Sequence, residues 1–327
     1  MKTFALATLA AAAQATLMTT ADYAFMNYIT THNKYYETVE EYKLRQEIFI
    51  RTELAIEELN TKNANYTAGH NKFSDWTQAE KDQLLGLKNM DLPEPYYPKI
   101  GFSGERNGSP IDWRTVDGVV TPVKDQGACG SCWAFSATET VESAWVIAGN
   151  EQVIMAPQEL VDCAKSILTN HGCNGGWYYY AWDWLKTHKS MRESDYPYTS
   201  GTTGEETTCA YDESKGVTNT KGYVHVAEDT ASIKAAIEQR PVSVAVSAGN
   251  DVFMYYTGGI ITEDMGCPTR VDHAIQAVGW GSEGGQDYYI VRNSWSADWG
   301  EDGFVRIGTG SGAGTCGINA YVYSVTL

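Results

Sequence analysis

Two cysteines with two residues between them stand in the segment 126–135, QGACGSCWAF, and this spacing is compatible with several kinds of chemistry. Cys129 and Cys132 could bind a metal, form a redox pair, enter disulfides or include a nucleophile. A zinc site would need a second ligand pair at comparable spacing, which Cys163 and Cys173 do not supply. A thioredoxin-like redox site would need a surrounding βαβ pattern, which the residues before the segment lack. A disulfide cysteine and a nucleophilic cysteine remain.

The N-terminus and the cysteine count favour one reactive thiol. The first residues, MKTFALATLAAAAQATLMTTA, combine a lysine, a short apolar run and the small-x-small pattern Ala13-Gln14-Ala15, which predicts a signal peptide over 1–15, with cleavage after Ala21 as the alternative. The apolar run is too short to span a bilayer. Secreted cysteines are expected to pair, and the odd count of seven leaves one thiol free.

Local physics favours Cys132 as that thiol and as a nucleophile. It lies near the start of a helix predicted over 131–149, where unpaired N–H groups and the helix dipole favour an anion and lower a thiol pKa. A thiolate nucleophile needs a base that a third group orients. His273 opens a predicted core strand and Asn293 ends the next strand, so both can lie beside Cys132. A neutral asparagine orients the imidazole without removing the charge that pairs with the thiolate.

The elements that must position these residues change character along the chain. Helices are predicted over 37–60, 131–149, 156–163 and 177–188. After one more helix over 231–239, apolar β-branched runs between glycines predict strands over 241–248, 273–281, 287–295 and 303–308. We therefore expect an α+β fold with a helical lobe, a β lobe and a cleft between them.

Four motifs together carry a family resemblance. The segments QGACGSCWAF, GCNGG, DHAIQAVGWG and NSWSADWG resemble those of the papain family of cysteine peptidases, over nearly the whole chain. The spacing also fits, since 273 − 132 gives 141 residues to His273 and 293 − 132 gives 161 to Asn293. The resemblance implies a papain-like fold with a helical left lobe, a β-barrel-like right lobe, and a preceding, mostly helical propeptide.

The resemblance also implies residue roles. Cys132 would be the nucleophile, His273 the general base and acid, and Asn293 the orienting group. Gln126 and the backbone N–H of Cys132 would form the oxyanion hole, and Trp295 would shield the His273–Asn293 pair from water. The implied disulfides are Cys129–Cys173, Cys163–Cys209 and Cys267–Cys316. Counting alone cannot choose this connectivity.

Substrate would bind in an extended form, with the backbone of Gly176 as a partner. The residues implied in substrate binding are Gly175, Gly176, Trp177, Tyr178, Ala245, Val271, Asp272, Trp295 and Tyr321. The pocket for the second residue before the scissile bond matches Trp177, Tyr178, Ala245, Val271 and Tyr321. It is large and apolar, so aliphatic or aromatic side chains are expected there rather than arginine. Trp177 and Tyr178 could instead simply pack the third helix.

The N-terminal region resembles the propeptide of cathepsin L-like enzymes. The ERFNIN spacing is met by Glu41, Arg45, Phe49, Ile56 and Asn60, with Thr52 where that pattern has asparagine. The companion G-x-N-x-F-x-D pattern is met by Gly69, Asn71, Phe73 and Asp75. The expected organisation is an inhibitory propeptide over 22–105 and a peptidase domain over 106–327. The alternative is an ordinary helical domain that is never removed.

Composition limits the partners. A net charge of −17 without a basic run argues against nucleic acid or an anionic membrane as the main partner. The expected partners are protein and peptide substrates, the chain's own propeptide and inhibitors of the cystatin type, with no metal or cofactor and a monomeric state. The secretory pathway is the expected location, either lysosome or vacuole or the exterior, with glycan acceptors at Asn65 and Asn107. A catalytically silent homologue and a ligase or acyl transferase on the same site are the rival functions.

Overall fold

The computed structural model describes residues 18–62, 64–87, 99–103, 109–166 and 168–327. The predicted signal peptide over 1–15 and the acceptor Asn107 lie outside these residues. Cleavage after Ala21 would fall inside helix α1 (Thr20–Thr31) and would remove Thr19, whose side chain caps that helix. Among the described residues, no helix has the length and apolar character needed to cross a bilayer.

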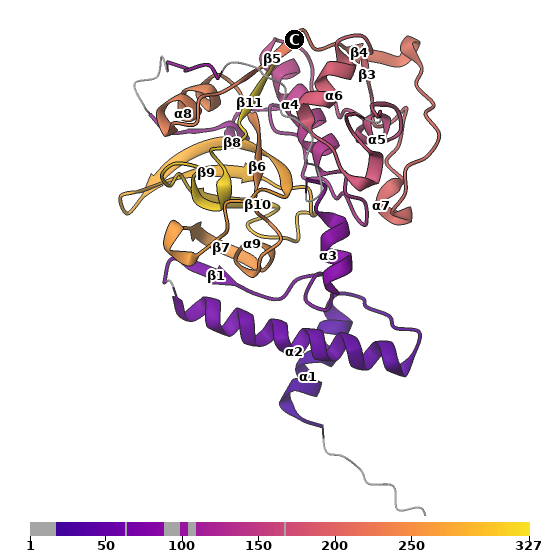
Figure 1. The fold of residues 1–327 in the computed structure, drawn as a ribbon, viewed down its shortest axis with the longest axis vertical. Helices are drawn as coiled ribbons and strands as arrows, with labels where there is room; N and C mark the ends of the chain where they lie inside the picture. Colours follow the sequence, from indigo (N-terminus) through magenta and orange to yellow (C-terminus); the bar gives the residue numbers. More distant parts are fainter. Residues whose placement is uncertain (1–17, 63, 88–98, 104–108, 167) are drawn as a thin grey trace, which may run out of the picture.

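A helical lobe forms around α4 (Cys132–Ile147), the helix that the sequence predicts over 131–149. The helices α5 (Pro157–Cys163), α6 (Tyr178–Leu185) and α7 (Ser200–Thr203) accompany it on one side of the molecule (Figure 1). The short strands β3 (Ser190–Met191) and β4 (Gly216–Thr218) pair beside them. Pro157 opens α5 at a position where a missing backbone N–H costs no hydrogen bond.

The second lobe is built on one large sheet. Its strands follow the order β1 (Tyr66–Ala68), β7 (Tyr256–Ile261), β10 (Phe304–Gly308), β9 (Gln286–Arg292), β8 (His273–Glu283), β6 (Val242–Val246), β11 (Tyr323–Thr326) and β5 (Gly222–His225). A further strand, β2 (Ile111–Asp112), pairs with β8, and α8 (Thr230–Gln239) and α9 (Asp251–Met254) lie against the sheet. This order has two ends, so the barrel-like lobe is an open sheet.

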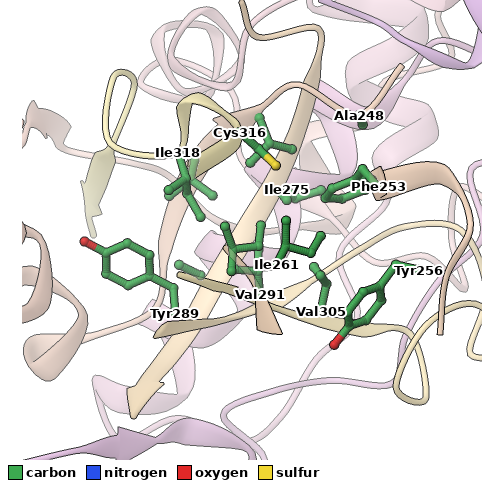
Figure 2. Packing of buried hydrophobic residues seen from close by; sticks show 14 of the residues in the cluster. Ala248, Phe253, Tyr256, Ile261, Ile275, Tyr289, Val291, Val305, Cys316 and Ile318 are labelled. Carbon is green, nitrogen blue, oxygen red and sulfur yellow. The ribbon is translucent and has the colours of Figure 1, made fainter. Parts of the chain in front are cut away.

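A large hydrophobic cluster fills the sheet lobe. Figure 2 shows Ile261, Val291 and Val305 from neighbouring strands facing Ile275 and Phe253. All five side chains are buried. A second cluster, which includes Trp133, Val141 and Trp182, fills the helical lobe. Each lobe therefore has its own hydrophobic core. The functional site is expected where the two lobes meet.

The N-terminal region packs against the sheet lobe as a separate layer. In Figure 1, α2 (Val39–Lys62) crosses below β1, β7 and α9, and α3 (Gln78–Leu84) points toward the boundary between the lobes. The strand β1 extends the sheet by pairing antiparallel with β7. Phe49, Ile56 and Leu59 are buried on α2, whereas Leu44 on the same helix is 46% exposed.

Thr52, the departure from the ERFNIN pattern, has a local explanation. It is buried, and its hydroxyl hydrogen-bonds the hydroxyl of Tyr255 at 3.2 Å. Arg45 pairs with Glu41 at 3.5 Å, as the helical spacing predicts, but its shorter bonds of 2.5 and 2.8 Å go to Glu80 on α3. These polar contacts join α2 to α3 and to the sheet lobe.

Buried charges join the two lobes behind the site. Glu139 and Glu142 lie on α4, and Lys124 approaches them at 3.7 and 2.8 Å. Arg292, at the end of β9, lies 3.3 Å from Glu139 and is fully buried. Two carboxylates therefore face two cations, and this balance lets them remain buried. The network links the helix that begins at Cys132 with the strand that ends before Asn293.

Candidate active site

The predicted nucleophile is the first residue of α4. Cys132 is fully buried and is the free cysteine of the described chain. The other six cysteines form Cys129–Cys173, Cys163–Cys209 and Cys267–Cys316, which is the implied connectivity. The first disulfide lies three residues before Cys132 and anchors the loop that carries it.

His273 and Asn293 meet across neighbouring strands. Register pairs Gln276 on β8 with Arg292 on β9, so the residue after Arg292 lies near the start of β8. The His273 Nε2 atom lies 2.8 Å from Asn293 Oδ1. Asn293 Oδ1 also accepts from the backbone N–H of Ser294 at 2.8 Å, which identifies it as the amide oxygen.

This geometry determines the imidazole tautomer. Because Asn293 Oδ1 accepts, His273 Nε2 carries the proton and Nδ1 keeps its lone pair. His273 Nδ1 is buried and has no hydrogen-bond partner among the described residues. The Trp295 ring lies over the imidazole with ring centroids 4.7 Å apart, and both residues are fully buried. His273 Nδ1 is thus a proton acceptor in surroundings from which water is excluded.

Gln126 is held at every polar group. Its backbone N–H donates to the Ser294 carbonyl at 2.9 Å, and its side-chain oxygen accepts from the Ser294 hydroxyl at 2.8 Å. Its side-chain amide donates to the carbonyls of Cys129 and Leu84, both at 2.9 Å. The last contact places a carbonyl of the N-terminal region on the donor that the sequence predicts for an oxyanion.

Residues 84–87 pass through the site between the lobes. The Gly176 N–H donates to the Gly86 carbonyl at 3.1 Å, and the Leu87 N–H donates to the Asp272 carbonyl at 2.9 Å. A Cβ placed on Gly86 would lie 2.9 Å from Cys132 Sγ and 2.3 Å from the Gly130 carbonyl. The chain therefore lies directly over the thiol, with glycine at the point of closest approach.

Burial by residues 84–87 shifts the pKa values of Cys132 and His273. Desolvation raises the pKa of Cys132 to about 11, although backbone N–H groups of Ala274 and Gly86 oppose it. Desolvation also lowers the pKa of His273 to about 4, against the hydrogen bond with Asn293. The expected lowering of the Cys132 pKa is thus wrong for the precursor, because burial outweighs the helix N-terminus. Thiol and imidazole are both neutral in this state.

The residues implied in substrate binding lie together around this segment. Leu87 is buried in the same cluster as Trp177, Tyr178 and Ala245, against which Val271 and Tyr321 pack. The rings of Trp177 and Tyr321 lie 4.9 Å apart. Gly175 adopts φ +114° and its carbonyl accepts from the His171 N–H at 2.8 Å, which shapes the loop before Gly176. Leu87 of the N-terminal region is therefore buried in the same hydrophobic cluster as these residues.

Two cleft residues were missed by the sequence reasoning. Gly86 and Leu87 lie after the G-x-N-x-F-x-D pattern and belong to none of the motifs. The dipeptide, in LLGLK, carries a weak signal, namely a glycine between leucines shortly before the proline-rich segment. No group of three or more histidine, cysteine, aspartate or glutamate side chains in the described chain is placed to hold a metal ion.

A thiol at a helix start, an oriented imidazole and a cleft filled by the chain's own N-terminal region define the precursor of a cysteine peptidase. Residues 108–326 match the family described as papain family cysteine protease, and residues 25–80 match the cathepsin propeptide inhibitor domain. The chain belongs to the papain family and carries this propeptide inhibitor domain.

Relatives support the same assignment. The chain is 40% identical to cysteine protease XCP2 of Arabidopsis thaliana over 306 residues, which cover 90% of this chain and 83% of that protein. It is 35% identical to pro-cathepsin H of Mus musculus, over 95% of this chain and 92% of that protein. The solved structure of digestive procathepsin L2 from the Tenebrio molitor larval midgut superposes with a TM-score of 0.84 at 31% identity, covering 94% of this chain and all of that one.

Proposed function

We propose that the mature protein is an endopeptidase that acts through Cys132 and His273, with Asn293 as the orienting residue. The observation that carries the proposal is the free Nδ1 lone pair of His273, which the bond from Nε2 to Asn293 leaves available to the thiol. Removal of the propeptide would let water into the cleft. The desolvation that keeps both groups neutral would then fall, and a proton could pass from Cys132 to His273 Nδ1.

The reaction would proceed in two stages. The Cys132 thiolate attacks the peptide carbonyl, and the oxyanion receives hydrogen bonds from the Gln126 side chain and the Cys132 N–H. His273 then gives its proton to the leaving amine, which departs and leaves a thioester on Cys132. In the second stage His273 takes a proton from water and the water oxygen attacks the thioester carbon. The carbon–sulfur bond then breaks, the acid product departs, and the Cys132 thiolate beside protonated His273 is restored.

Substrate selectivity is expected to follow from the apolar pocket implied around Trp177, Tyr178, Ala245, Val271 and Tyr321. We expect peptides with leucine or phenylalanine as the second residue before the scissile bond to be cleaved at least about tenfold faster than peptides with arginine there, because the pocket has no acidic group to pair a buried cation. The kcat/KM values of three otherwise identical substrates would measure this. Faster cleavage of the arginine peptide would contradict the assignment of the pocket.

The same substrates separate hydrolysis from the rival chemistries. With an added amine acceptor, a ligase or acyl transferase would give a product with the mass of the transferred peptide, whereas a peptidase gives the free acid. A silent homologue would give neither product. Endopeptidase cleavage is expected at internal bonds, because no insertion resembling an occluding loop stands between Cys173 and Cys209.

The proposed setting is the secretory pathway, ending in a lysosome, a vacuole or the exterior. Three disulfides are consistent with an oxidising compartment. The predicted glycan acceptor Asn65 is exposed at the edge of β1. Inhibition by cystatin-type proteins and a monomeric state remain predictions for the purified mature enzyme.

Release of the propeptide is proposed to depend on Asp75. This carboxylate is buried and accepts from Tyr28 at 2.7 Å, from Lys34 at 2.7 Å and from Tyr36 at 2.8 Å. The ion pair with Lys34 joins the segment between α1 and α2 to the segment before α3. Asp75→Asn removes this ion pair and weakens the packing of the propeptide, so self-processing is expected to begin at a pH about one unit higher than in the wild type.

Glu80→Gln is the matched control for Asp75→Asn. Burial acts to raise the pKa of Glu80, but hydrogen bonds from Arg45 and Thr77 outweigh it and lower the pKa to about 2. A carboxylate with a lowered pKa loses its stabilising effect only as the pH falls through its pKa in the folded state. Glu80 therefore stays ionised at pH 4–5. The control should keep the wild-type pH dependence. Processing of Asp75→Asn at the wild-type midpoint would rule out Asp75 as the trigger.

A further inference from the structure

The hydroxyl of Tyr198 lies between the two residues that hold the expected oxyanion donors. It donates to the backbone carbonyl of Gln126 at 2.8 Å, and it lies 2.7 Å from the hydroxyl of Ser131. Gln126 carries one donor on its side chain, and Ser131 directly precedes Cys132, whose N–H is the other. A single phenol group therefore contacts both sides of the donor pair, from a loop more than 60 residues further along the chain.

The hydrogen count determines the direction of these bonds. A carbonyl oxygen can only accept, so the one hydrogen of the Tyr198 hydroxyl points to Gln126. Ser131 must then donate its own hydrogen to Tyr198. The alternative acceptor of Ser131, the Cys129 carbonyl, lies 3.5 Å away and is much weaker. Burial raises the pKa of Tyr198, so the phenol keeps its proton over the working range of a peptidase.

The Ser131 side chain does not form the hydrogen bond that is usual for a serine at a helix N-cap. Serine at the N-cap of a helix ordinarily accepts a hydrogen bond from one of the first free N–H groups. Ser131 is the N-cap of α4 but makes no such bond, and its side chain contacts Tyr198 instead. The Ser131 hydroxyl is therefore committed to the Tyr198 hydroxyl and does not cap α4.

The loop that carries Tyr198 supports the Gln126 loop at further points. The Ala128 N–H donates to the Gly201 carbonyl at 2.8 Å. The Tyr198 N–H donates to Glu193 Oε1 at 2.8 Å, and the Tyr198 ring packs edge-on against Phe135 with centroids 4.8 Å apart. The position of the hydroxyl is thus set independently of Gln126 and Ser131. A support that is fixed by other contacts can hold the donors in place before substrate arrives.

We propose that Tyr198 is a positioning residue for oxyanion stabilisation, acting through the Gln126 carbonyl and the Ser131 hydroxyl. The inference rests on the proposed role of Gln126 and deepens it. Without the phenol hydroxyl, the Gln126 carbonyl loses its buried partner and the loop can rotate away from the site. Small displacements of an oxyanion donor act on the transition state and leave ground-state binding nearly unchanged.

The test compares Tyr198→Phe with Tyr196→Phe in the acid-processed mature enzyme. Tyr196 is the matched control, because its hydroxyl also makes two bonds, to Asp162 and to the Ala210 N–H, both at 2.9 Å, but touches neither Gln126 nor Ser131. Active enzyme is counted by titration with an irreversible thiol reagent. Tyr198→Phe is expected to lower kcat on an amide substrate about tenfold with KM within about twofold of wild type. Tyr196→Phe should leave both values unchanged.

The rate at which iodoacetamide alkylates Cys132 separates a loss of oxyanion stabilisation from general loosening of the fold. General loosening would change this rate, whereas a loss of oxyanion stabilisation alone would not. The displacement of iodide forms no oxyanion, so Tyr198→Phe should alkylate at the wild-type rate across pH. A slower alkylation that matches the loss in kcat would overturn the proposal, since the defect would then lie in the thiolate. Ser131→Ala, which removes only one contact of the hydroxyl, should cause a smaller loss in kcat and provides a second variant if Tyr198→Phe does not fold.

Gln126→Ala separates this inference from the proposed function. If Gln126→Ala leaves kcat unchanged, the oxyanion role of Gln126 is wrong and the inference falls with it. If Gln126→Ala lowers kcat strongly and Tyr198→Phe has no effect, only the inference is wrong. In the Gln126→Ala background, adding Tyr198→Phe should lower kcat by a markedly smaller factor than it does in the wild type. The effect of Tyr198 that acts through the Gln126 side chain is already lost in that background.

Discussion

Replacing Cys132 with alanine is expected to lower peptide hydrolysis by at least about 10⁴-fold and to stop the precursor from removing its own N-terminal region. No other free thiol exists among the described residues to take over the attack. The substitution removes one sulfur atom from a tightly packed position, and the fold should tolerate it. The purified precursor, wild type beside Cys132→Ala, is incubated at pH 4–5 and its fragments are measured by mass spectrometry.

Three outcomes of this experiment are informative. Loss of about residues 22–105 from the wild type alone, followed by cleavage of a leucine-containing peptide, supports both the nucleophile and the self-processing precursor. Cleavage of the Cys132→Ala precursor by added wild-type enzyme is the control that shows that the variant is folded and processable. Self-processing by the alanine variant would show that Cys132 is not the catalyst. If neither protein is processed, an external activator or a silent homologue becomes the better explanation.

Placing valine at Gly86 is expected to open the site of the intact precursor. Even a Cβ there would lie 2.3 Å from the Gly130 carbonyl and 2.9 Å from the Cys132 sulfur, and the backbone carbonyl cannot yield. The segment must lift away, which admits water and lowers the pKa of Cys132 from about 11. Alkylation of the precursor by iodoacetamide at pH 7 should therefore become about 100-fold faster than in the wild type.

Gly101→Val is the control for Gly86→Val. Gly101 lies in the same N-terminal region, but a Cβ on it meets only Ser232 Oγ at 3.6 Å, an ordinary contact. This control should alkylate as slowly as the wild type. Equal and slow alkylation of Gly86→Val would mean that residues 84–87 do not guard the thiol, and the inhibitory role of this segment would have to be placed elsewhere in the propeptide.

Local patterns predicted most of the elements, because their signals lie within a few residues of one another. Cys132 begins α4 close to where the helical pattern and Ser131 indicate, and His273 begins β8 where a β-branched run follows a loop. Where the prediction was wrong, the cause was packing. Leu44 fits the apolar spacing of α2, yet it is exposed, whereas Phe49 packs against Phe25 and Tyr28 of α1 and Ile56 packs in the cluster of the sheet lobe.

The sequence by itself determined the class of chemistry and the identity of the candidate groups. An odd number of cysteines after a predicted signal peptide, a histidine and an asparagine at strand ends, and a charged helical region before a proline-rich segment are all readable from residue types and spacing. They depend on covalent order and on hydrophobic periodicity, which act over short distances along the chain.

Only the tertiary structure decided the protonation and the support of the site. A pKa depends on which groups exclude water, and the groups that bury Cys132 include Gly86, which lies 46 residues away (132 − 86). The support of Gln126 comes from Tyr198, a further 72 residues along the chain. Desolvation and hydrogen bonding act through space, so contacts between distant segments were needed to show that burial raises the pKa of the Cys132 thiol and that one phenol contacts both Gln126 and Ser131.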